Sequence, residues 1–186
     1  MNEKQGFLAD NITEAIQSNR KRFQEWFSFA EELNQYALQV MLGLTLHNKD
    51  RQECLIGPLF ARIMETYEGA FLLAERGMVA GAKMLARGML EALFSLGAIA
   101  KDDSFARVFI LDDTIQRKNV VKKHKEWKRD FFNEPSEAEA FQQDIEDKIK
   151  KENIKELRTS DIAIKAGMKD LYLTGYTLLS STIHSR

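Results

Sequence analysis

Residues 78–100 read MVAGAKMLARGMLEALFSLGAIA and are the most apolar stretch of the chain. Only Lys83, Arg87 and Glu91 interrupt the run with full charges, all in its first two thirds. A membrane-spanning helix of this length rarely carries three charges, because each is costly in hydrocarbon. We therefore expect this stretch to be the most buried helix of a soluble, globular fold.

Helices are expected on both sides of this stretch. The chain has 186 residues but only two prolines, and no segment alternates with the period of two that is typical of a strand. Apolar side chains recur at steps of three or four over residues 22–46 and predict a long amphipathic helix. They are Trp26, Phe29, Leu33, Tyr36 and Val40. Gly57 and Pro58 are expected to break or kink the helix that follows.

Capping residues predict where several helices begin. Asp50 is expected to cap the helix before Gly57, and residues 101–104 to end the central helix and cap another that reaches about residue 132. Pro135 and Ser136 should open a charged surface helix over residues 136–157, and the last helix should start at Met168. The prediction is one all-α domain over residues 1–186, a multi-helix bundle of about six helices with residues 1–20 as an N-terminal arm.

Composition excludes several classes of function. The net charge of −1 and the pI of about 6.3 give no overall field that would attract nucleic acid or an anionic membrane. Cys54 is the single cysteine, which fits a reducing, cytoplasmic location. The chain has three histidines, no Glu-x-x-His pair, and neither a GxxxxGK[ST] nor a GxGxxG loop. We expect no metal and no cofactor.

The three charges of the central helix lie at i, i+4 and i+8 and so share one face. One interpretation is a narrow solvated stripe, in which Arg87 and Glu91 pair weakly in water. The other is a charged pair directed into a cleft, where buried charges must find partners. Both interpretations stay open at the level of sequence.

The closing helix carries hydroxyls and an imidazole on one side. Tyr172, Tyr176, Ser180 and His184 follow one another at steps of four. If this side is buried, a connected hydrogen-bond network is expected. Alternatively, its serines bond their own backbone. The candidate catalytic residues are His184, Arg87 and Glu91, and the candidate ligand-binding residues are Tyr176, Ser180, Ser181 and Lys83.

Residues 117–129, RKNVVKKHKEWKR, form the one local basic patch. A solvated basic face is one interpretation, and a nucleic-acid-binding face is the other. Arg117 and His124 also fit the Arg-x(4–6)-His motif of HEPN (higher eukaryotes and prokaryotes nucleotide-binding) ribonucleases, although Lys118 stands where that family has a small polar residue. The candidate nucleic-acid-binding residues are Arg117, Lys118, Lys122, His124, Lys125 and Arg129.

Two longer blocks resemble a bacterial all-helical family known only as a domain of unknown function. They are KMLARGMLEALFSLGAIAKD and DIAIKAGMKDLYLTGYTLLSSTIHS, and the likeness rests on Arg87, Glu91, Tyr176, Ser180 and His184. Thr177 departs from the family, which usually has arginine there, and relatives generally continue past the histidine. The resemblance implies a shared helical fold in which these two helices meet and His184 belongs to an internal polar site with Arg87 and Glu91.

Two functions are consistent with these patterns. The first is a helical binding or interaction module that forms a homodimer or holds a small ligand. The second is a HEPN-like, metal-independent ribonuclease acting on RNA, which would suit a toxin or a protein of bacterial stress or phage defence.

Overall fold

The computed structural model describes residues 6–8, 12–126, 135–153 and 155–183, and this part of the chain contains helices and no strand. The predicted all-α class is confirmed, with more helical segments than the six or so expected. The segments are η1 (Gly6–Leu8), α1 (Ile12–Arg22), α2 (Gln24–Gly43), α3 (Arg51–Glu75), α4 (Val79–Lys101), α5 (Asp103–Glu126), α6 (Pro135–Glu152), α7 (Thr159–Lys165), α8 (Lys169–Leu171), η2 (Tyr172–Tyr176) and α9 (Thr177–Ile183).

Local chemistry explains where the expected helices differ from the observed ones. Asp50 caps α3 as predicted, because its carboxylate accepts hydrogen bonds from the backbone N–H groups of Gln52 and Glu53. Of the break or kink predicted at Gly57 and Pro58, the break is absent, since α3 runs through both residues. The last helix is not uniform either, because η2 is a turn of π-helix between α8 and α9.

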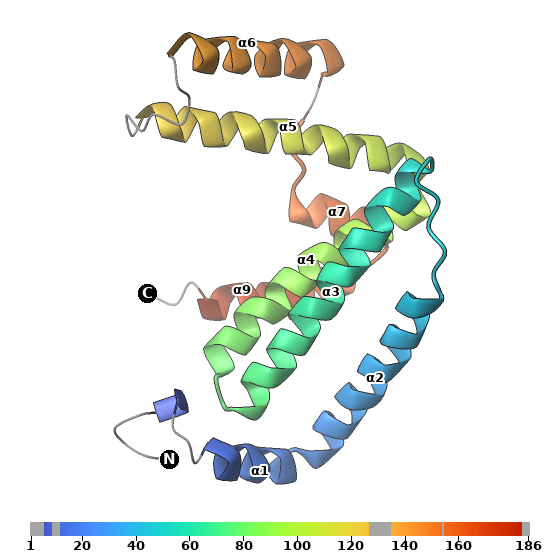
Figure 1. The fold of residues 1–186 in the computed structure, drawn as a ribbon, viewed down its shortest axis with the longest axis vertical. Coiled ribbons are helices and arrows are strands. Elements are labelled where there is room, and N and C mark those ends of the chain that lie inside the picture. Colours follow the sequence, from blue (N-terminus) through green and yellow to red (C-terminus); the bar gives the residue numbers. More distant parts are fainter. Residues whose placement is uncertain (1–5, 9–11, 127–134, 154, 184–186) are drawn as a thin grey trace.

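The centre of the fold is the antiparallel pair α3 and α4, which lie side by side over most of their length (Figure 1). Within the described residues, α4 contributes more buried residues than any other helix, which confirms the prediction made from its composition. Phe94 and Ile99 of α4 are fully buried. The apolar stretch thus serves as the element against which the other helices pack.

The segment α7–α9 crosses α4 on the side away from α2 (Figure 1). A close approach is possible because Gly97 of α4 has no side chain. A Cβ atom at this position would lie 3.2 Å from Cβ of Ala166 and 2.9 Å from Cε of Met168. The turn between α7 and α8 places Gly167 at φ +71°, a backbone conformation that favours glycine. The sequence-based division at Gly167 is confirmed.

Two lysines tie α7 to the end of α4. The ammonium of Lys101 donates to the backbone carbonyl of Ala166 at 2.7 Å, and Lys165 pairs with Asp102 at 2.8 Å. Hydrogen bonds from Lys165 and Ser104 lower the pKa of the Asp102 carboxyl to about 2. Asp102 therefore holds the start of α5 and the end of α7 together as a carboxylate.

Helices α5 and α6 form a separate layer across one end of the α3–α4 pair (Figure 1). Ile145 of α6 is buried against α5, and Lys118 pairs with Glu146 at 3.7 Å. Most other described residues of α6 are exposed, as expected for the charged helix over residues 136–157. The helix ends earlier than predicted, at Glu152.

Helices α1 and α2 form an arm along the outer side of α3 (Figure 1). Arg20 of α1 pairs with Glu31 of α2 and with Glu75 of α3, and its guanidinium lies 5.7 Å from the ring centres of Phe27 and Phe71. Tyr67 of α3 donates to the backbone carbonyl of Ala30 at 2.8 Å. These contacts fasten the first half of α2, and the rest of its apolar face is left exposed.

The central helix α4 is long, but its composition is not that of a membrane-spanning helix. No helix in the described part of the chain combines the length and the apolar composition needed to cross a bilayer.

Substituting valine for Gly97 should destabilise the fold, because the new side chain overlaps Ala166 and Met168. The same substitution at Gly88 is a matched control, since a Cβ atom there meets nothing within 4 Å. Urea unfolding followed by circular dichroism should give Gly97→Val a lower free energy of unfolding than Gly88→Val, by about 1–3 kcal/mol. Equal stabilities would contradict the close approach of α7 to α4.

Candidate functional site

Arg87 and Glu91 of α4 meet Tyr176 of η2, so the two blocks singled out in the sequence are in contact. The hydroxyl of Tyr176 donates to Oε1 of Glu91 at 2.7 Å and accepts from the guanidinium of Arg87 at 3.1 and 3.3 Å. Arg87 and Glu91 also pair directly, with Nε and Oε1 3.3 Å apart. One phenol oxygen therefore bridges a cation and an anion across two helices.

The ring of Tyr176 is buried while the charges around its hydroxyl stay near the surface. Its residue exposure is only 8%, and its ring stacks on Tyr172 with centroids 5.2 Å apart. Phe94 of α4 meets the same ring edge-on at 6.0 Å. The side chains of Arg87 and Glu91 are 28% and 40% exposed. The cluster is therefore a polar cap over an aromatic core. Arg87 and Glu91 remain partly solvated, as in the first interpretation of the charged stripe, and they also find a buried partner, as in the second.

Both charges of the cluster are neutralised within it. The hydrogen bond with Tyr176 raises the pKa of the Arg87 guanidinium above its ordinary value, and the charge of Glu91 adds to the effect. Arg87 is thus a permanent cation with an anion beside it. This arrangement suits the anchoring of η2 on α4 better than it suits proton transfer, for which a group that titrates near neutral pH is needed.

The remaining candidate ligand-binding residues are not part of this cluster. The hydroxyl of Ser181 donates to the backbone carbonyl of Leu178 at 2.8 Å, which matches the alternative of serines bonding their own backbone. The hydroxyl oxygen of Ser180 is buried and has no hydrogen-bond partner among the described residues. His184 lies outside the described residues, so its predicted place beside Arg87 and Glu91 stays a prediction.

The basic patch is partly neutralised by acidic neighbours. Arg117 of α5 donates to Asp113 at 2.6 Å, one turn earlier on the same helix, and Lys118 pairs with Glu146 of α6. Lys122 is exposed. Arg129 and the side chains of His124 and Lys125 lie outside what the structure describes. The described part of this face therefore resembles a solvated charged surface.

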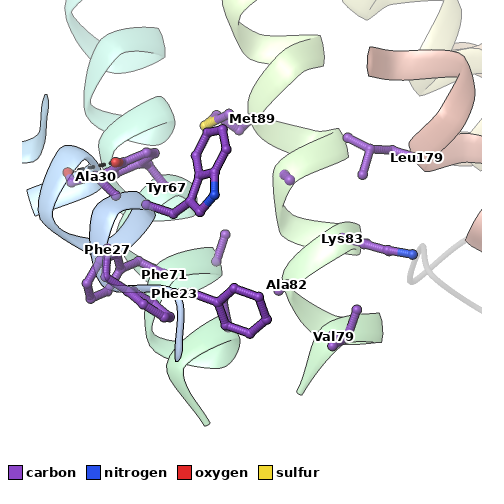
Figure 2. Close-up of a pocket in the computed structure, with 14 residues that line it drawn as sticks. Phe23, Phe27, Ala30, Tyr67, Phe71, Val79, Ala82, Lys83, Met89 and Leu179 are labelled. Atoms are coloured by element: carbon purple, nitrogen blue, oxygen red, sulfur yellow. Dashed lines mark hydrogen bonds between the residues drawn. The ribbon is translucent and has the colours of Figure 1, made fainter. Parts of the chain in front are cut away.

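A cleft of about 500 Å³ opens between α2, α3, α4 and α9 (Figure 2). Ring side chains of α2 and α3 form one wall, and small residues of α4 together with Leu179 of α9 form the other. Lys83 is the only charged residue of the lining, and its ammonium is directed away from the ring side chains (Figure 2). The lining residues are Phe23, Trp26, Phe27, Ala30, Tyr67, Ala70, Phe71, Ala74, Val79, Ala82, Lys83, Ala86, Met89 and Leu179.

Sequence reasoning found Lys83 but missed the cleft. The aromatic residues of α2 predict an amphipathic helix, but their spacing does not say how far that helix stands from α4. The sequence signal that could have indicated the cleft is the pair Ala82 and Ala86, whose small side chains leave a shallow strip on a helix that otherwise carries larger ones. Small side chains opposite aromatic ones leave space when the two helices are held apart by a third.

The described residues offer no obvious metal site. No group of three or more histidine, cysteine, aspartate or glutamate side chains in this part of the chain is arranged to hold a metal ion. The cysteine present, Cys54, is exposed on α3.

One comparison with known proteins identifies the family. The profile of a family of unknown function (DUF5677) matches residues 53–186, which is most of the chain, and the chain belongs to that family. The matched region begins within α3 and includes α4, η2 and α9, so it contains the contact between Arg87, Glu91 and Tyr176. No curated protein and no solved structure matches the chain.

Removing the hydroxyl of Tyr176 should destabilise the fold more than removing that of Tyr172. Tyr176→Phe abolishes hydrogen bonds to two charged groups, whereas no hydrogen bond of the Tyr172 hydroxyl is present among the described residues. We expect chemical denaturation to show a loss of about 1–2 kcal/mol for Tyr176→Phe, and less than about 0.5 kcal/mol for Tyr172→Phe. Equal losses would mean that the bridge to Arg87 and Glu91 adds nothing.

Proposed function

We propose that this member of the DUF5677 family is a helical binding module whose cleft holds a small, elongated, apolar molecule with an anionic end. The observation that carries the proposal is the cleft itself, at about 500 Å³ with a lining in which thirteen of fourteen residues are uncharged. Binding sites for small molecules are commonly clefts of about 300–1,000 Å³ with mostly apolar walls and few polar groups.

Keeping such a surface open to water is unfavourable, and this supports a ligand-binding role. Trp26 and Val79 at the cleft are 75% and 56% exposed. Covering apolar surface yields about 25 cal/mol for each Å² removed from water. A bound apolar molecule would therefore gain much of its affinity from contacts that the empty cleft leaves unused.

Lys83 supports an anionic end on that molecule. Within the described residues its ammonium has no acidic partner, and it extends from α4 at the rim of the cleft (Figure 2). An ion pair at a partly exposed rim adds little affinity, about 1 kcal/mol or less, but it fixes which end of a ligand faces outward.

The polar cluster supports the cleft from one side. Leu179, which closes the cleft, is on α9 less than one turn after Tyr176. Since Tyr176 is held between Arg87 and Glu91, the cluster fixes where Leu179 stands. In this proposal Arg87, Glu91 and Tyr176 position the wall of the site and do not themselves contact the ligand.

Filling the cleft should weaken binding without harm to the fold. Ala82 lines the cleft on α4, whereas Met84 on the same helix is 58% exposed and is absent from the lining. The fluorescence of 1-anilinonaphthalene-8-sulfonate should report saturable binding, competed by dodecanoate. We expect Ala82→Phe to weaken dodecanoate binding about tenfold or more, and Met84→Phe to leave it unchanged. The absence of saturable binding to the unaltered chain would refute the proposal.

The anionic end is tested separately by neutralising Lys83. Lys83→Met should weaken dodecanoate binding and leave dodecanol binding unchanged, because only the former carries a charge. An equal effect on both ligands would remove Lys83 from the site and leave the apolar cleft in place.

A metal-independent ribonuclease of the HEPN type is the alternative proposal. It is favoured by one observation: Arg87 is a permanent cation that is 28% exposed, on the helix that contacts the segment leading to His184. Such an enzyme uses an arginine to stabilise phosphate charge and a histidine to move protons. A role in bacterial stress or phage defence belongs to this alternative.

Substituting alanine for His184 separates the two proposals. In the ribonuclease, His184→Ala should abolish cleavage of a single-stranded RNA in the presence of a metal chelator, with an unchanged circular dichroism spectrum. In the binding module, the unaltered chain should not cleave RNA and His184→Ala should bind dodecanoate as before. Cleavage by the unaltered chain that survives His184→Ala would exclude this residue as the catalytic group.

A homodimer and a cytoplasmic location are further parts of the proposal. The location is supported by the single cysteine, Cys54, which is an exposed thiol. Neither part depends on which molecule occupies the cleft.

A further inference from the structure

The outer face of α2 carries a row of large apolar side chains that nothing in the described chain covers. Trp26 is 75% exposed, Phe29 61%, Leu33 44%, Tyr36 67% and Val40 39%. The row covers four turns of helix, on the side away from the carboxylate of Glu31 that pairs with Arg20. Single exposed apolar residues are common on proteins, but a continuous patch of this kind marks an interaction site.

The spacing of the row is that of a helix made to pair with another helix. The five residues follow one another at steps of three, four, three and four, which are the a and d positions of a heptad. In that scheme Trp26, Leu33 and Val40 occupy a, while Phe29 and Tyr36 occupy d. We refer to these five residues as the seam. A two-heptad seam selects a helical partner over an extended peptide.

The chain exposes more surface than a compact monomer of its mass. The accessible surface of the whole chain is 13395 Å², whereas a compact monomer of 21.4 kDa exposes about 9,100 Å². The exposed row on α2 contributes to this excess, and a standard interface would remove about 800 Å² from each partner.

The charges beside the seam argue against a lipid surface. Helix α2 contains Glu25, Glu31 and Glu32 and neither lysine nor arginine. Helices that lie on membranes carry basic residues on the polar face, which attract anionic lipids. Acidic residues beside the row of aromatic ones would be repelled by such a surface, so a protein helix is the better match.

We propose that the seam pairs with the seam of a second copy of this chain, which forms a two-fold symmetric dimer. A two-fold interface requires that one patch be complementary to itself, and an uncharged apolar stripe meets this condition. Leu33 is the midpoint of the seam and occupies an a position, so a parallel pairing that buries the whole seam places the two copies of Leu33 opposite each other. The small side chain of Ala37 beside it allows the close approach that knobs-into-holes packing needs.

The seam shares Trp26 with the cleft, but Phe29, Leu33, Tyr36 and Val40 are not part of the cleft lining, and the variants that test the dimer change only residues outside that lining. Failure of the dimer therefore leaves the binding proposal standing, and the failure of ligand binding leaves the dimer standing.

The mass of the protein in solution tests the dimer directly. Sedimentation and light scattering over a hundredfold range of concentration should give twice the chain mass of 21.4 kDa for the unaltered protein. Tyr36→Glu should give the mass of one chain with an unchanged circular dichroism spectrum, because Tyr36 is already exposed in the isolated chain. The matched control Gln35→Glu adds the same charge one residue away, outside the seam, and should remain dimeric. A monomeric unaltered chain, or a dimer that Tyr36→Glu leaves intact, would overturn the proposal.

A cross-link tests where the two copies touch. In a Cys54→Ser background, Leu33→Cys should form a disulfide between two chains under mild oxidation, whereas Gln35→Cys should not. Cross-linking at Gln35 in place of Leu33 would show a dimer built on another face and would overturn the assignment of the seam.

Discussion

The hydroxyl of Tyr176 is the interaction on which the arrangement of the C-terminal half depends. It donates to Glu91 and accepts from Arg87, so it satisfies two of the charges that stand on the predominantly apolar α4. Without a polar group from the crossing segment, this face of α4 would have to stay in water, because burying an unpaired charge is costly. The bridge lets η2 and α9 cover the helix while the charged atoms keep partial access to solvent. Packing of the Tyr172 and Phe94 rings beneath it then excludes water from the core.

The position of α2 determines how the rest of the surface behaves. Tyr67 and the Arg20 ion pairs hold the first half of α2 on α3, but they hold it at a distance from α4. The space left between α2 and α4 becomes an apolar cleft, and the side of α2 that faces away from α3 becomes the seam. Both features therefore arise from one geometric fact: within the described residues α2 packs mainly against α3 and meets α1 as well, so it buries only part of its apolar face.

Much of the fold follows from the sequence, because the deciding signals are local. The run over residues 78–100 predicts the central helix, Asp50 predicts a helix start, and Gly167 predicts a division, and all three are found. The contact between the Arg87–Glu91 block and the Tyr176 block was expected from resemblance, not from spacing. The cleft was not predictable, because it depends on the distance between helices that are far apart in sequence. The alternative of a break at Pro58 is not found, although Pro58 is the eighth residue of α3, because tertiary packing can outweigh the backbone hydrogen bond that an interior proline removes.

The π-turn of η2 has a consequence for how the end of the chain is read. A π-turn accommodates one residue more than an α-helical turn. Without the extra residue, everything after Tyr176 would rotate by about 100° around the helix axis. Leu179 would then leave the cleft wall, and a different side of α9 would face α4. The side of α9 that faces α4 is therefore set by the π-turn before it. An uninterrupted α-helix over residues 168–183 would present a different set of α9 side chains to α4.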